Sequence, residues 1–350
     1  MRHSSTVASL FCMTLISAVS IAALACISLA ADIDTGRTRL FKFVMGTSMR
    51  VEVYGGDAHT RQQAADEAFA AIAEVDRVMS DYRDDSELTR VNREAAARPV
   101  PVSAPLFAVL DAAGTVARQS DGAFDVTMRP LGALWGLRSP APRVPSAAEL
   151  TRVRPLVGFR GLQLDVQAHT VHFARAGMSI DLDGVAKGFA SELAAKSLRR
   201  RGLAGVVDTG GHQYMVGLPP GKSSWSIGIG HPFQPGTLLG SLDIHGGAVS
   251  TTAAESSDGP GRAVARRVLD PRTLQPSAMC VSATVVSPDG TTAQALSHAA
   301  CVMGSSAGLA LFDRFADTWG IVAYRAPDGS VGVRVSPGHV RDFHPIARRD

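Results

Sequence analysis

Aromatic residues, cysteines and one-sided charge are all scarce in this chain of 350 residues. Aromatic side chains make up only 6% of the sequence, so a hydrophobic core must be mainly aliphatic and rich in alanine. The 35 lysine and arginine residues nearly balance the 32 acidic residues, and the net charge is +3. No basic cluster larger than Arg199 to Arg201 is present, so the composition predicts no nucleic-acid partner.

The four cysteines are too few for a disulfide framework, and their spacing matches no Cys/His metal site. Cys12 and Cys26 fall in an apolar N-terminal segment, which leaves Cys280 and Cys301 in the rest of the chain. An exported protein can form a disulfide between these two cysteines. We expect instead that they are two small buried hydrophobic side chains.

Familiar nucleotide-binding and hydrolase signatures are missing as well. The stretch 228–230 lacks the third glycine and the following helix of a dinucleotide fingerprint, and no phosphate loop of the form Gly-x-x-x-x-Gly-Lys-Ser/Thr is present. The Gly-x-Ser-x-Gly match at 304–308 follows a predicted helix rather than a strand, which argues against a serine hydrolase. A nucleotide site in this chain must therefore be of another kind.

The N-terminus carries no charged residue between His3 and Asp32, and it is mainly apolar from Leu10 to Ala31. This pattern predicts export, with residues 1–31 as a signal peptide or membrane anchor. A small-x-small cleavage site lies at 28–30, Cys26 ends an imperfect lipoprotein motif, and the run is long enough to cross a bilayer uncleaved. We expect a periplasmic protein that contacts the inner membrane only through this segment, as an anchor or through lipid on Cys26.

One stretch, Asp181 to Phe189, organises the rest of the chain, because a buried strand predicted at 178–180 turns there directly into a helix. Apolar residues recur at helical spacing through Leu198, and Gly202 stands at the C-terminal cap position. The start of a helix has unpaired backbone N–H groups and the positive end of the helix dipole. With two aspartates and Lys187 beside them, these groups favour a phosphorylated ligand, or a metal with its phosphate. The alternative is an ordinary connector without a ligand.

Helices and short strands alternate along the remaining chain, without repeats, and indicate one mixed sheet in a single α+β domain. We expect strands at 41–54 as a hairpin bending at 46–47, and at 171–173, 178–182, 204–211, 225–229, 240–245, 248–252, 266–270, 279–287, 321–325 and 331–335. We expect helices at 58–79, up to 92, at 106–117, after 184, at 292–303 and at 306–319.

Seven blocks, each weak alone, together resemble the family of FAD:protein FMN transferases, also called the ApbE family. In family order they are Met45–Thr47, Met79–Leu88, Gly122–Asp125, Asp181–Phe189, Val207–Gly211, Leu269–Thr273 and Ser282–Val286. The similarity continues beyond Met303. It implies a mixed-sheet, T-fold-like α+β domain of the ApbE type over 38–350, after the N-terminal segment.

The resemblance implies an exported enzyme that takes FAD as substrate, splits its pyrophosphate with Mg²⁺, and links FMN to a threonine or serine of a partner protein. It places eight residues on flavin- and nucleotide-contacting positions: Met45, Tyr82, Ala123, Phe124, Asp125, Asp181, Lys187 and Leu269. Asp181 and Lys187 are the catalytic candidates. Phosphoryl transfer requires charge neutralisation at the pyrophosphate, which a helix start, Lys187 and a cation can supply.

The sequence departs from the family at the metal ligands. The family's late helix reads Ala-Asp-Ala-x-x-Thr, with the Asp and Thr side chains on magnesium, whereas residues 293–298 read Ala-Gln-Ala-Leu-Ser-His. The metal-binding positions therefore carry the Gly184 carbonyl, Gln294, Ser297 and His298. Magnesium prefers carboxylate oxygen, so an amide and an imidazole weaken its binding.

Further departures are His212 in place of an acidic residue, Thr-Ala-Ala at 252–254 in place of Ser-Gly-Asp, and Arg267 in place of a histidine. Two alternatives to the transferase follow from these substitutions. One is a non-catalytic FAD-binding accessory protein, and the other is an FAD pyrophosphatase that passes FMN to water.

Overall fold

The computed structural model describes residues 36–139, 142–253 and 268–346. The predicted export segment, including Cys26, lies outside these residues, and so does Arg267. Among the residues that are described, no helix combines the length and apolar character needed to cross a membrane.

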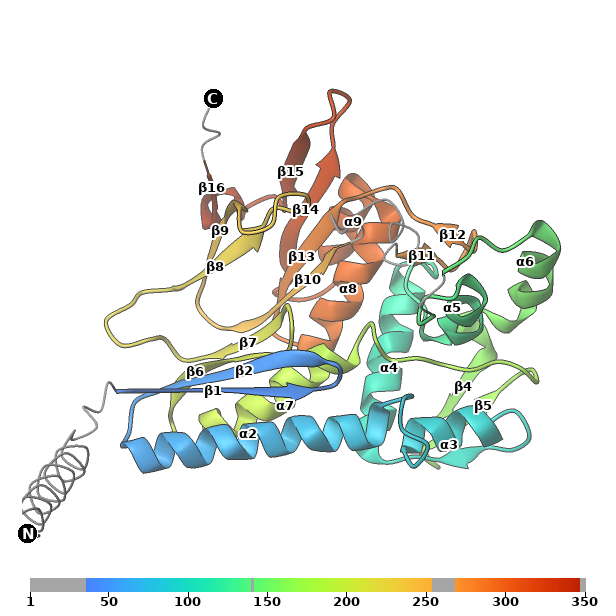
Figure 1. The fold of residues 1–350 in the computed structure, drawn as a ribbon, viewed down its shortest axis with the longest axis horizontal. Helices are drawn as coiled ribbons and strands as arrows, with labels where there is room; N and C mark the ends of the chain where they lie inside the picture. Colours follow the sequence, from blue (N-terminus) through green and yellow to red (C-terminus); the bar gives the residue numbers. More distant parts are fainter. Residues whose placement is uncertain (1–35, 140–141, 254–267, 347–350) are drawn as a thin grey trace, which may run out of the picture.

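An eight-stranded antiparallel sheet forms the centre of the fold (Figure 1). In spatial order its strands are β1 (Arg37–Val44), β2 (Thr47–Tyr54), β6 (Ala204–Asp208), β7 (His212–Val216), β10 (Gly247–Ala253), β13 (Ser282–Ser287), β14 (Trp319–Arg325) and β15 (Val331–Val335). Successive residues of a strand point to opposite faces, so Val285 and Val286 of β13 enter two different hydrophobic clusters. Both faces of the central strands are therefore buried.

Four helices cover one face of this sheet: α2 (Ala58–Met79), α7 (Ala186–Arg200), α8 (Gly290–Met303) and α9 (Ser305–Phe312). Their apolar residues recur at helical spacing, as with the buried Ala68, Ile72 and Val75 of α2. A further helix, α4 (Ala104–Gln119), packs against α8. The main core lies between the sheet and these helices.

A smaller three-stranded sheet covers the opposite face of the central strands. It consists of β8 (Trp225–Gly230), β9 (Leu238–Ile244) and β16 (Phe343–Pro345). Trp225 and Leu242 from this sheet join Val249 and Ile321 from the large sheet in a second, separate cluster. The large sheet thus has helices on one face and strands on the other.

The remaining elements form a third part beside α4 and α8, at the right of Figure 1. They are α3 (Glu87–Glu94), β3 (Val100–Pro101), α5 (Arg129–Trp135), α6 (Ala147–Val153), β4 (Leu162–Asp165), β5 (Thr170–Phe173), β11 (Leu269–Asp270) and β12 (Gln275–Pro276), with 3₁₀ turns at Val126–Met128, Arg154–Leu156 and Phe159–Gly161. A fourth 3₁₀ turn, Val340–Asp342, directly precedes β16 of the small sheet. The indole N–H of Trp135 donates to the carbonyl of Leu274 at 3.1 Å, which ties α5 to the turn between β11 and β12.

Most predicted elements are confirmed, and their ends follow the predicted caps. Asp57 accepts a hydrogen bond from the Thr60 amide at 2.7 Å and begins α2. Gly202, just beyond α7, has φ +64°, a left-handed conformation that glycine adopts without a steric penalty. The two cysteines of the described chain, Cys280 and Cys301, are buried free thiols, as predicted.

The predicted strand at 178–182 is wrong. Its residues Met178, Ile180 and Leu182 are buried, but they pair with no neighbouring strand. The Asn92 side chain instead accepts from the Ile180 amide at 2.8 Å and donates to the Ile180 carbonyl at 2.9 Å. The Asp181 amide donates to the carbonyl of Val126 at 2.9 Å. The segment is an extended connector whose backbone is satisfied by a side chain and a loop.

The predicted helix at 306–319 is too long, because α9 ends at Phe312. The amides of Arg314 and Phe315 donate to carbonyls three residues earlier, which tightens the chain into turns. Trp319 already belongs to β14, where it pairs with Val286.

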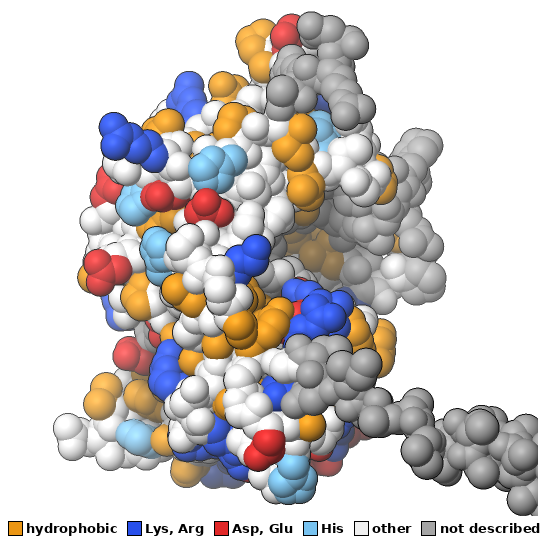
Figure 2. Space-filling view, turned by 90° about the vertical axis from the view of Figure 1, so that its left-hand side faces the viewer, with side chains coloured by type: hydrophobic (Ala, Val, Ile, Leu, Met, Phe, Trp, Pro, Cys, Tyr) orange, Lys and Arg blue, Asp and Glu red, His pale blue; other side chains and the backbone are white. Residues whose placement is uncertain are grey.

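The surface carries no segregated charge on the face that Figure 2 presents, where acidic, basic and histidine side chains are interspersed with hydrophobic ones. This distribution agrees with the nearly balanced composition.

Candidate functional site

A cavity of about 580 Å³ opens beside the connector that leads into α7. Six of the residues predicted to contact flavin or nucleotide line it: Tyr82, Ala123, Phe124, Asp125, Asp181 and Leu269. Two residues predicted at the metal also line it, Gly184 and His298. The volume is in the range of sites for small organic ligands.

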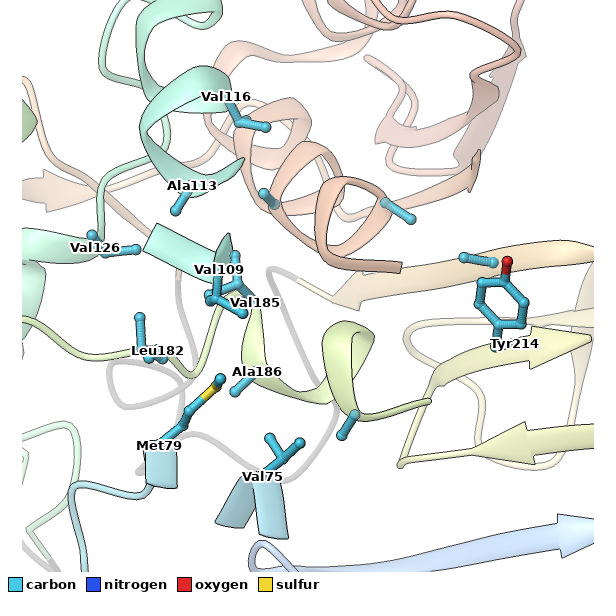
Figure 3. Packing of buried hydrophobic residues seen from close by; sticks show 14 of the residues in the cluster. Val75, Met79, Val109, Ala113, Val116, Val126, Leu182, Val185, Ala186 and Tyr214 are labelled. Atoms are coloured by element: carbon cyan, nitrogen blue, oxygen red, sulfur yellow. The ribbon is translucent and has the colours of Figure 1, made fainter. Parts of the chain in front are cut away.

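The connector is fixed by its apolar residues. Leu182, Val185 and Ala186 point into the main core between α2 and α4, as Figure 3 shows with Met79 and Val109 nearby. The neighbouring residues Asp181, Asp183 and Gly184 line the cavity instead. Burial of the apolar residues in the core thus places Asp181, Asp183 and Gly184 where a ligand can contact them.

The start of α7 has fewer free amides than predicted. The Val185 and Ala186 amides both donate to the Leu182 carbonyl, at 3.0 and 2.8 Å. The Gly188 amide donates to the Oε1 atom of Gln294 at 2.7 Å. The prediction of an open row of N–H groups is therefore wrong for these three positions, because the tight turn and a side chain of α8 satisfy them.

Phe124 and Tyr82 line different parts of the cavity. Phe124 is buried and meets the His298 ring edge-on, with the centroids 6.4 Å apart. A Cβ atom at Gly184 would lie 2.9 Å from Phe124, so only glycine fits there without displacing the ring. Tyr82 is 73% exposed and stands under the guanidinium of Arg138, 4.5 Å from the ring centroid.

Arg138 links two carboxylates at the cavity. Its guanidinium bonds to Asp81, which also contacts Arg129 at 3.3 Å, and to Asp183 at 2.9 Å. The Asp81 carboxylate is nearly buried, so these two arginines offset a charge that would be costly alone. Arg138 lies in none of the seven blocks, and a single arginine after a helix carries no sequence signal, so sequence reasoning missed it.

Asp181 lies among these charges. Burial, followed by the nearby Asp183 carboxylate, raises the pKa of Asp181 from the ordinary 3.8 to about 7, although Arg138 opposes the shift. Near neutral pH its carboxyl group therefore exists in both protonation states, as an acid or base catalyst requires.

The Asp125 carboxylate accepts hydrogen bonds from neighbouring loop residues. Its Oδ1 atom accepts from the amide and hydroxyl of Thr127, both at 2.7 Å, and its Oδ2 atom accepts from the Phe159 amide at 2.6 Å. Burial raises the pKa of Asp125. Its hydrogen bonds hold the loop that carries Phe124, so Asp125 lines the cavity but is committed to loop structure.

Met45 and Lys187 are the two predicted contacts that do not line the cavity. Met45 forms the hairpin turn with φ +49°, one residue before the predicted bend, and packs against the main core. Lys187 is half-buried in the first turn of α7, and its carbonyl accepts from the Thr209 hydroxyl at 2.9 Å. Burial lowers the pKa of both His212 and His298, and the positive charge of Lys187 adds to the shift.

His212 lies in a buried polar group that the sequence did not single out as a site. Burial, with His298 and Lys187, lowers its pKa to about 3. The His212 Nδ1 atom and the hydroxyl of Ser250, its partner on β10, are buried without a hydrogen bond.

The predicted metal-site residues of α8 lie together but bond to one another and to the backbone. Gln294 is fully buried, and its Nε2 atom donates to the Asp183 carbonyl at 2.7 Å. Ser297 bonds to the Gln294 carbonyl at 2.8 Å and to the Thr252 hydroxyl at 2.6 Å. The Nδ1 atom of His298 lies 2.9 Å from the same hydroxyl and 3.1 Å from the Gln294 carbonyl.

These residues do not fit a magnesium ion. They offer no carboxylate, the amide oxygen of Gln294 is taken by Gly188, and its amide nitrogen occupies the Asp183 carbonyl. Over the described ranges of the chain, no group of three or more His, Cys, Asp or Glu side chains is arranged to hold a metal.

Known proteins with related sequences are flavin transferases. A family model described as the ApbE family matches residues 45–321. The FAD:protein FMN transferase of Treponema pallidum (strain Nichols) is 30% identical over 320 residues, which cover 84% of this chain and 88% of the relative. The FAD:protein FMN transferase of Salmonella typhimurium is 28% identical over 286 residues, covering 79% of each protein.

Solved structures share this α+β fold. The flavin transferase ApbE of Vibrio cholerae matches with a TM-score of 0.74 at 26% identity, covering 87% of this chain and 99% of that one. The apo form of the Pseudomonas stutzeri flavinyl transferase ApbE matches with a TM-score of 0.75 at 26% identity, covering 88% and 96%.

Proposed function

This chain belongs to the ApbE family, and we propose that it transfers FMN from FAD to a threonine or serine hydroxyl of an exported redox protein. The observation that carries the proposal is one cavity lined by six of the eight residues that the family pattern assigns to flavin and nucleotide. The relatives are themselves FAD:protein FMN transferases.

The cavity suits the two ends of a flavin nucleotide. In the proposal, Phe124 and Tyr82 flank the flavin ring as apolar walls, since both line the cavity. The diphosphate lies beside the 181–184 connector, where Arg138 supplies positive charge, and Lys187 follows in the first turn of α7.

The proposed reaction exchanges one phosphorus–oxygen bond for another. The acceptor hydroxyl oxygen bonds to the phosphorus of the FMN half, the bond to the AMP half breaks, and AMP leaves. Asp181 accepts the hydroxyl proton, because a carboxyl group with a pKa of about 7 takes up a proton at neutral pH. No step is assigned to a metal, since the residues of α8 do not fit one.

We further propose that residues 1–31 direct the chain to the periplasm, as a cleaved signal, an inner-membrane anchor or a lipid-bearing segment. The acceptor protein then meets the transferase in that compartment. Intact-mass measurement of the mature N-terminus distinguishes the three forms.

A non-catalytic FAD-binding protein is the second candidate function. The observation that favours it is the Gln294 side chain, whose two polar atoms are both engaged where the family pattern has a metal-binding aspartate.

The test is incubation of the purified protein with FAD and an acceptor protein, with and without magnesium chloride, followed by separation of flavin species. Flavin bound covalently to the acceptor supports transfer, free FMN indicates pyrophosphatase activity, and intact bound FAD indicates a carrier. Asp181→Asn is expected to abolish transfer, whereas Asp111→Asn, at an exposed position of α4, is the matched control and keeps it.

A further inference from the structure

We propose that the carboxamide of Gln294 takes the structural place of a divalent cation in this chain, so that the site binds its nucleotide without a metal. The identity of the nucleotide rests on the proposed function. The inference that the site needs no divalent cation rests on the contacts of Gln294.

A close helix crossing brings Gln294 to the connector. Helices α7 and α8 meet backbone to backbone at Gly188 and Gly290, where a Cβ atom on Gly188 would lie 2.0 Å from the Gly290 carbonyl oxygen. Gln294 follows Gly290 by about one helical turn and therefore faces the same side of α8. At this separation its side chain reaches both the first turn of α7 and the connector before it.

The carboxamide of Gln294 lies between a backbone donor, the Gly188 amide, and a backbone acceptor, the Asp183 carbonyl, and it forms a hydrogen bond with each. Its oxygen accepts from the Gly188 amide and its nitrogen donates to the Asp183 carbonyl, each at 2.7 Å. A carboxylate at this position has no proton to offer the carbonyl, so two oxygens would face each other without a donor. A bound cation resolves that conflict by attracting both oxygens, and the Gln294 N–H₂ group resolves it without a cation.

The surrounding charges also disfavour a divalent cation. Lys187 lies half-buried in the first turn of α7, directly after the connector, and forms no ion pair with any residue that the structure describes. The Asp183 carboxylate is committed to Arg138 at 2.9 Å. A divalent cation would break the two buried hydrogen bonds of Gln294, and it would be repelled by the positive charges of Lys187 and Arg138. No free carboxylate is present to compensate for the hydration that the cation would lose. Arg138, which lines the cavity, provides positive charge for a diphosphate.

Thermal unfolding of the nucleotide-free protein tests the inference independently of the proposed function. Magnesium chloride, compared with sodium chloride of equal ionic strength, is expected to leave the wild-type Tm unchanged. Gln294→Glu preserves the size of the side chain but removes the donor, so its Tm is expected to fall and to recover when magnesium is added. A wild-type Tm that rises with magnesium and saturates overturns the inference, even if the variant does not fold.

Titration with FAD provides the second readout. In EDTA and in magnesium the wild-type Kd is expected to agree within about twofold, whereas Gln294→Glu is expected to bind about tenfold more weakly in EDTA and to recover in magnesium. Gln163→Glu, on the exposed side of β4, is the control and should behave as the wild type. A wild-type Kd that weakens at least about tenfold in EDTA contradicts the inference. If FAD binds under neither condition, the proposed function fails, and the melting experiment still decides on the cation.

Discussion

Asp181, the proposed catalytic residue, lies where burial and the Asp183 carboxylate disfavour its ionised form. Its pKa in the folded protein is about 7, above the ordinary 3.8, so the folded state holds this proton more tightly than the unfolded chain. The resulting stability is present below about pH 4 and is lost as the pH rises to about 7. Such a cost is typical of residues retained for function.

Asp181→Asn removes the ionisable group and is expected to raise stability at pH 8, by roughly 2 kcal/mol, with little effect at pH 4. Denaturant unfolding at the two pH values measures this difference. Equal changes at both pH values would show that the carboxyl group does not titrate near 7, and transfer activity that survived in the variant would remove Asp181 from catalysis.

His212 makes folding stability depend on pH with the opposite sign to Asp181. Its folded-state pKa is about 3, below the ordinary 6.5, so the folded protein resists a proton that the unfolded chain accepts. Its contribution to stability is complete above pH 6.5 and is lost as the pH falls toward 3.

His212→Asn is therefore expected to make the protein more resistant to acid, by on the order of 2 kcal/mol at pH 4 relative to pH 7. Unfolding midpoints across this range provide the measurement. A variant with the same acid sensitivity as the wild type would contradict the assignment of a buried neutral imidazole.

At the residue scale the sequence predicted which side chains meet but not where their polar atoms point. Tyr82, Phe124 and Asp181 share one cavity, as the family pattern implied. Asp125 also reaches it, yet its carboxylate bonds to backbone amides, which no sequence pattern reveals. Arg138 was missed because its importance comes only from the fold, which sets it beside Asp81 and Asp183.

At the scale of elements, the crossing of α7 and α8 supports the site. Gly188→Ala inserts a Cβ atom 2.0 Å from a backbone carbonyl, so the two helices must separate. We expect a loss of about 3 kcal/mol in stability and weaker FAD binding, because Gln294 then no longer reaches the connector.

The matched control is Gly114→Ala in α4, where a Cβ atom would meet only the flexible end of Arg118 at 3.2 Å. This change is expected to stabilise the protein by about 0.5 kcal/mol through helix propensity. Equal effects of the two substitutions in chemical denaturation would show that the crossing tolerates side chains.

The α8 residues can also be changed toward the family pattern. Gln294→Asp combined with His298→Thr is expected to create magnesium binding and to raise magnesium-dependent transfer about tenfold. Calorimetric titration with magnesium and the transfer assay check the two effects. If neither metal binding nor rate changes, the interpretation of this helix is wrong.

Most helices and strands were predictable because apolar periodicity and caps are local signals. The exceptions have non-local causes. The 178–182 segment has the composition of a buried strand, but Asn92 and Val126 take its backbone hydrogen bonds. The 306–319 segment is apolar enough for one helix, but Trp319 is required by β14.

At the scale of the whole molecule, the class of fold was predictable and the order of strands was not. Alternating helices and short strands indicated an α+β domain, and the family pattern implied its type. The large sheet, expected to be mixed, is antiparallel at every pairing among the described strands. Sheet order depends on pairings between distant segments, such as β2 with β6 and β7 with β10, which no local pattern specifies. These pairings bring three of the blocks together at the start of α7, where Thr47 lies against Gly210 and Thr209 bonds to Lys187.

The central claim is that a flavin nucleotide occupies the cavity beside the 181–184 connector without a metal ion. The most direct measurement is a crystal structure of the full complex with FAD, grown in EDTA. We predict the flavin between Phe124 and Tyr82, the diphosphate beside Asp181 to Gly184, and both Gln294 hydrogen bonds intact. FAD bound elsewhere, or a diphosphate ordered in that cavity only after magnesium is added, would contradict the account.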